Sequence, residues 1–80
     1  MVYTTQITKA GLKDHHAGGK NSVVVNFPLT PINQREWTPA PSLDPNMVLA
    51  IVLAAMHTGK SVEVDLDTGP DFIKSISLLA

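Results

Sequence analysis

The chain has 80 residues, a net charge of −1 at pH 7 and no cysteine. This length provides for one domain, residues 1–80, and a core so small usually needs a disulfide, a metal or a partner subunit. Without cysteine, disulfides and thiolate zinc sites are excluded, so we expect the partner subunit.

The first half of the chain predicts two strands. Residues 2–9 are rich in threonine, isoleucine and tyrosine, which favours a strand. A loop that contains glycine is predicted after it, over residues 13–21. The alternation in Ser22–Leu29 predicts a second strand. Its apolar face comprises Val23, Val25, Phe27 and Leu29.

A proline-rich stretch follows, and it contains Trp37, the only tryptophan. Proline favours edge strands and irregular segments, so we expect at most a short strand here. The indole has two interpretations at this point. It closes the core as a lid, or it forms a platform for a ligand.

The clearest element is a helix over residues 45–58. Asp44 can cap its first turn, and Pro45 suits the first helical position because the N–H it lacks would be unpaired there. Gly59 can adopt the left-handed conformation that ends a helix, and Lys60 favours the negative pole of the helix dipole.

The alternation of residues 61–67 predicts a strand, and a turn at 67–70 leads to a last strand over 72–79. One central apolar helix among these strands predicts a small α+β fold. We expect an OB-like, mainly antiparallel sheet or barrel of five strands.

The helix contains ten consecutive apolar residues, Met47–Met56. One stripe is predicted to pack on the sheet: Leu49, Val52, Leu53 and Met56. A second apolar surface remains: Met47, Ala50, Ile51 and Ala54. Because one sheet covers one side of a helix, we expect copies of the chain to cover the second surface. The alternative is that the proline-rich stretch with Trp37 folds over it.

Several segments resemble, in order and spacing, the B subunits of bacterial AB-type toxins of the subtilase cytotoxin and pertussis-like group. The helix, the Thr-Gly-Lys turn and the next strand carry most of the resemblance, over residues 44–64. Shorter matches are Thr4-Thr5-Gln6, Glu36-Trp37 and Pro70-Asp71-Phe72-Ile73-Lys74.

The resemblance implies an OB-fold subunit that assembles into a ring, usually a pentamer, with its helices lining the pore. Such rings bind cell-surface glycans and carry a catalytic partner. The chain departs from the family in having no cysteine pair. The family's sugar-binding aromatic residues in the strand after the helix are replaced here by Asp65 and Leu66.

The chemical motifs favour structural roles. Gly59-Lys60-Ser61 follows a helix, whereas a phosphate-binding loop precedes one. Asp65, Asp67 and Asp71 lack the glycine and glutamate positions of a calcium loop. The pair His15-His16 and the isolated His57 match no metal spacing, and no carboxylate–histidine pair stands beside a nucleophile. We therefore expect no enzyme, cofactor or metal site.

Charge is divided unevenly along the chain. Residues 1–35 hold four basic residues and one acidic residue, and residues 36–80 hold two basic and six acidic residues. A dipolar monomer accounts for this division, which could also orient neighbouring copies. With so weak a basic field and only four aromatic residues, we expect no nucleic-acid binding.

The apolar run is too short for a membrane span, which needs about 20 residues. No signal peptide is evident, so we expect a cytoplasmic protein, or a secreted one if a leader has been removed. Two functions remain open. One is a ring-forming subunit that binds a glycan or receptor. The other is an intracellular assembly or inhibitor protein of a phage or plasmid type, which has the same ring fold without a glycan site and holds a partner or a small ligand.

Overall fold

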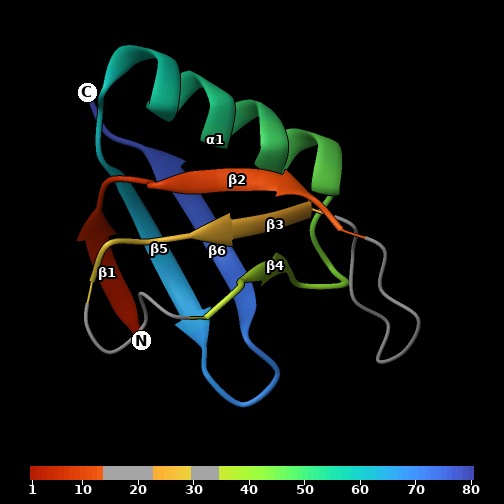
Figure 1. The fold of residues 1–80 in the computed structure, drawn as a ribbon. Coiled ribbons are helices and arrows are strands. Elements are labelled where there is room, and N and C mark those ends of the chain that lie inside the picture. Colours follow the sequence, from red (N-terminus) through yellow and green to blue (C-terminus); the bar gives the residue numbers. More distant parts are fainter. Residues whose placement is uncertain (14–22, 30–34) are drawn as a thin grey trace.

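The computed structural model describes residues 1–13, 23–29 and 35–80. These residues form six strands and one helix, shown in Figure 1. In chain order they are β1 (Val2–Thr5), β2 (Lys9–Leu12), β3 (Val23–Asn26), β4 (Thr38–Pro39), α1 (Pro45–Thr58), β5 (Val62–Asp67) and β6 (Phe72–Leu78).

The strands form two sheets. The larger has the order β1-β5-β6-β4, and the smaller contains β2 and β3. All pairings are antiparallel except that of β4 with β6. Val25 and Trp37 link the two sheets through a backbone bridge whose N–H···O distances are 2.8 and 2.9 Å. The predicted small α+β fold is therefore confirmed, but the described strands form two sheets instead of one five-stranded sheet or closed barrel.

The predicted first strand, residues 2–9, already ends at Thr5 as β1, and a separate strand that was not predicted, β2, begins at Lys9. β1 pairs with β5, whereas β2 pairs with β3, so the chain leaves one sheet and enters the other over residues 6–8. The Thr8 N–H already donates to the Asn26 carbonyl at 3.0 Å. Most of the predicted loop 13–21 lies outside the described residues.

The core lies between α1 and the two sheets. β5 alternates as predicted, with Val62, Val64 and Leu66 buried and Glu63 and Asp67 exposed. From β3 and the segment after it, Val23, Val25 and Phe27 are buried in the same core, and Leu29 is half-buried against it.

The helix begins and ends where the sequence predicts. The Asp44 carboxylate accepts a hydrogen bond from the Asn46 N–H at 2.9 Å. At the other end Gly59 has φ of 70°, and the Lys60 N–H donates to the Ala55 carbonyl at 3.1 Å. Both ends thus satisfy backbone groups that the helix itself leaves unpaired.

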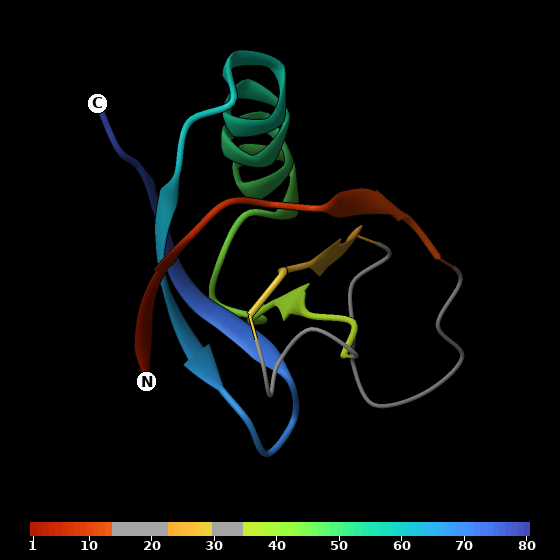
Figure 2. The ribbon, with the colours of Figure 1, turned by 60° about the vertical axis from the view of Figure 1, so that its left-hand side comes forward.

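The predicted inward stripe of α1 is confirmed at Val52 and wrong at Leu53 and Met56. Its buried residues are Val48, Val52 and Ala55, whereas Leu53 and Met56 are 53% and 40% exposed. Leu49 lies at the flank and is half-buried against the core. Figures 1 and 2 show α1 on one side of the molecule with the sheets beneath it. Two valines and one alanine therefore face the sheets, and the larger side chains of Leu53 and Met56 remain exposed.

Candidate self-association surface

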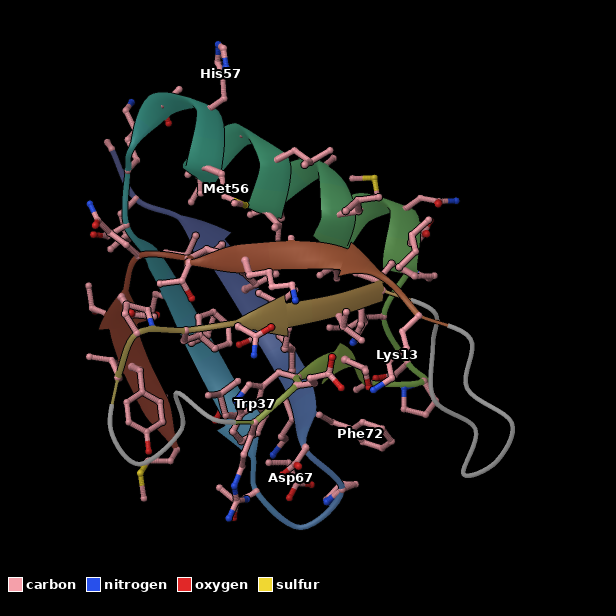
Figure 3. All side chains as sticks on the ribbon, in the orientation of Figure 1. Lys13, Trp37, Met56, His57, Asp67 and Phe72 are labelled. Carbon is pink, nitrogen blue, oxygen red and sulfur yellow. The ribbon has the colours of Figure 1, made fainter. Side chains whose placement is uncertain are left out.

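The exposed apolar side chains of α1 extend around its outward side. We define the outer helix face as Met47, Ala50, Leu53 and Met56, which are all exposed. Each is turned by about 60° around the helix axis from the one before it, so Met47 and Met56 stand on opposite flanks of Ala50 and Leu53. Met47 is 62% exposed, more than either of the other two large side chains of this face. Asn46 and His57 are exposed near its two ends, and Figure 3 shows His57 pointing away from the body of the molecule.

The structure divides the predicted interface residues. Met47 and Ala50 lie on the outer helix face, whereas Ile51 and Ala54 are half-buried, and Ile51 packs against the core. Leu53 and Met56, which we predicted to pack on the sheet, belong to the exposed surface instead. A helical wheel with Val48 and Val52 pointing inward would have placed Leu53 outside. The same wheel places Met56, which follows Val52 by four residues, on the inward side, so its exposure could not have been found in this way.

Trp37 does not cover this face. Its side chain is fully buried in the core cluster, so the interpretation as a lid agrees with the structure and the exposed ligand platform does not. Figure 3 places Trp37 on the side of the molecule opposite α1. Since Met47 and Leu53 stay more than half exposed, the described part of the chain leaves the outer helix face uncovered.

The outer helix face carries no formal charge, but charges stand at its two ends. The helix contains no aspartate, glutamate, lysine or arginine. Asp44 lies immediately before its first turn and Lys60 just beyond its last, and both are exposed. The end at Asp44 is therefore negative and the end at Lys60 positive.

The ion pairs away from α1 stabilise the loops. Arg35 Nη1 lies 3.0 Å from Asp71 Oδ1 and donates to the Thr68 carbonyl at 3.2 Å, which fastens the β5–β6 turn. Asp71 there has φ of 59°. Lys13 Nζ and Glu36 Oε1 form a second pair at 2.6 Å. These contacts use the side chains of exposed loops and form no site.

The aspartates after the helix do not gather around a cation. Asp67 accepts from the Gly69 N–H at 3.3 Å, and Asp71 is bound to Arg35. The Asp65 carboxylate lies 2.9 Å from the amino group of Met1, whose hydrogen bond lowers the pKa of Asp65. No group of three potential metal ligands occurs among the described residues. His15 and His16 lie outside them.

The Gly-Lys-Ser sequence has a structural role here. The same is true of Asp65 and Leu66, the positions where the resembling toxin subunits have sugar-binding aromatic residues. Gly59 and Lys60 form the C-cap of α1, as predicted, and no helix follows them to hold a phosphate. Leu66 is 2% exposed in the core, and Asp65 is bound to the amino group of Met1. Neither offers an aromatic surface to a sugar.

The described residues enclose no pocket. Their one helix, α1, does not have the length and apolar character that crossing a bilayer requires. The outer helix face is therefore the strongest candidate for a functional surface in the described structure. Comparison of the chain with protein-family models, with curated proteins and with solved structures finds no match.

Proposed function

We propose that the chain is a non-catalytic binding subunit that assembles with copies of itself through the outer helix face. The observation that carries the proposal is the exposure of three large apolar side chains, Met47, Leu53 and Met56, on a helix without acidic residues, lysine or arginine. Complete burial of a side chain of this size contributes about 1.5–3 kcal/mol. Met47, Leu53 and Met56 are 62%, 53% and 40% exposed, so burial of the exposed part of each would contribute roughly half of that amount.

The absence of charge favours a second copy as the partner. Identical surfaces that meet bring identical groups together, and like charges would oppose their contact. The outer helix face has none, and Ala50 at its middle allows a neighbouring backbone to approach closely. The resemblance to toxin B subunits adds an expectation of a ring, and such a ring would use the same exposed helix.

A glycan or a receptor is the ligand that the resemblance implies. One observation favours the other candidate, an intracellular assembly or inhibitor protein that holds a protein partner. Leu66 is buried and Asp65 is ion-paired at the positions where the resembling family places sugar-binding aromatic residues. A glycan array separates the two functions. Binding of the assembled protein to sialylated glycans would support the receptor-binding subunit, and an array without binding would support the assembly protein.

The test of self-association is the mass in solution by light scattering. One copy has a mass of 8.6 kDa, and we expect the protein to have a multiple of it. Leu53→Glu should lower the mass to that of one copy, because each association would bury a carboxylate. Thr68→Glu introduces the same group in the exposed β5–β6 turn and should leave the mass unchanged.

Circular dichroism shows whether both variants retain the fold. A wild-type protein with the mass of one copy at high concentration would contradict the proposed function. A folded Leu53→Glu variant that keeps the wild-type mass would show that association uses another surface.

A further inference from the structure

We infer that the outer helix face is a redox-controlled contact, in which oxidation of Met47 and Met56 to methionine sulfoxide separates the associated copies. The oxidant is a peroxide, such as hydrogen peroxide. This inference rests on the proposed function, which states that copies associate through this face, and it adds a chemical control of that association.

The oxidisable sulfur of the chain is concentrated on α1. The protein has three methionines and no cysteine. Two of the three methionines, Met47 and Met56, belong to the outer helix face, where their side chains are 62% and 40% exposed. Trp37, the only indole, is fully buried in the core. A peroxide therefore reaches reactive sulfur on the outer helix face and, away from it, only at Met1.

The two methionines of α1 stand on opposite flanks of the helix. Met47 directly precedes the buried residue Val48, and Met56 directly follows the buried residue Ala55. One residue corresponds to a turn of about 100° around the helix axis, so each methionine lies well to one side of the buried line. The rest of the outer helix face lies between them. A second copy that covers either flank therefore contacts a methionine.

Oxidation changes the polarity of these side chains. The thioether sulfur attacks one oxygen of hydrogen peroxide, the O–O bond breaks and an S–O bond forms. The proton of the transferred hydroxyl passes to the departing hydroxide, which leaves as water, so the sulfur loses the two electrons that the peroxide gains. The product is a polar sulfoxide in place of an apolar thioether. Burial of a polar group without a hydrogen-bond partner is unfavourable, and the outer helix face of a second copy offers no side-chain donor. The sulfoxides therefore oppose the contact.

The free copy is the form that the oxidant attacks. Its methionines are exposed, whereas association covers them. Oxidation thus removes free copies from the equilibrium and draws further copies out of the assembly by mass action. Methionine sulfoxide is reduced back to methionine by sulfoxide reductases, so this control is reversible.

Peroxide treatment followed by light scattering tests the inference. The matched control is the double variant Met47→Leu and Met56→Leu, which keeps two apolar side chains of similar volume but has no sulfur on α1. We expect the oxidised wild-type protein to fall to the mass of one copy, 8.6 kDa, and the treated double variant to keep its mass. Sulfoxide reductase should restore the mass of the wild-type protein.

The oxidation rate of each methionine, followed by mass spectrometry, provides a second test. Met1 is 72% exposed, and Figures 1 and 2 show the N-terminus on the side of the molecule away from α1. Met1 is therefore an internal control, which should be oxidised at the same rate at low and at high protein concentration. Met47 and Met56 should be oxidised more slowly at high concentration, because association covers them.

Three results would overturn the inference while the proposed association stands. The first is an associated protein that stays folded by circular dichroism, is oxidised at Met47 and Met56 and keeps its mass. The second is an associated protein in which both methionines are oxidised as fast at high concentration as at low concentration. The third is loss of the fold on oxidation, since the sulfoxides would then act on stability instead of on the contact. A wild-type protein with the mass of one copy before any oxidation is a different result, and both proposals then fail together.

Discussion

At the scale of single residues, Thr38 is the most unusual position in the core. Its side chain is 1% exposed, and its Oγ1 is the only buried side-chain oxygen or nitrogen without a hydrogen-bond partner in the described part of the chain. Its N–H donates to the Asp71 carbonyl at 3.1 Å, so the backbone is satisfied where the hydroxyl is not. A buried polar group without a partner destabilises the fold.

Replacement of this hydroxyl should stabilise the protein. Thr38→Val keeps the shape of the side chain and removes the unpaired oxygen, and we expect it to raise the free energy of unfolding by about 1 kcal/mol. Thr5→Val is the matched control, since Thr5 is also buried but its Oγ1 donates to the Gln6 carbonyl at 2.9 Å. Urea denaturation should show a lower free energy of unfolding for Thr5→Val than for the wild-type protein. A loss of equal size for Thr38→Val would mean that its hydroxyl has a partner.

At the scale of elements, the ends of α1 were predictable and its orientation was not. The ends depend on local chemistry at Asp44, Pro45 and Gly59, which the sequence displays directly. The orientation depends on which side of an entirely apolar helix meets the sheets. Because no polar face marks the solvent side, periodicity indicated Leu53 and Met56 as core residues, and the structure exposes both.

Some strands were likewise predictable from the sequence, and one was not. β5 was predictable from its alternation of apolar and acidic residues, and β3 from its three consecutive valines, all of which are buried. β2 was not, since Lys9-Ala10-Gly11-Leu12 contains no β-branched residue. It is a strand because it pairs with β3, more than ten residues further along the chain. Pairing between distant segments leaves little local signal.

The cap at the end of α1 gives a prediction at this scale. Gly59→Ala places a Cβ in open space but on a backbone with φ of 70°, so the whole cost is conformational. We expect a loss of about 1 kcal/mol in the free energy of unfolding. Gly11 on β2 has the same open space without the positive φ. Gly11→Ala should therefore be neutral or slightly stabilising in the same denaturation experiment, and equal losses would exclude the cap as the cause.

At the scale of the whole molecule, the sequence predicted the composition of the fold but not its division into two sheets. The Val25–Trp37 bridge joins those sheets, and nothing local to Trp37 indicates its distant partner. The candidate surface was predictable in part for the same reason. An uncovered apolar side of the helix follows from the size of the chain, and Met47 and Ala50 lie on it. The exposure of Leu53 and Met56 depends on how α1 is turned about its own axis against the sheets, and that orientation is set by the packed core.

The burial of Trp37 has a practical consequence. It is the only indole in the protein, and the wavelength of indole fluorescence follows the polarity of its surroundings. Unfolding transfers it from a fully buried position to water and shifts the emission to the red. The proposed contact between copies at α1 would lie on the opposite side of the molecule and leave these surroundings unchanged (Figure 3). The natural chain thus contains its own optical reporter of unfolding, and dissociation of the proposed assembly would not change its signal.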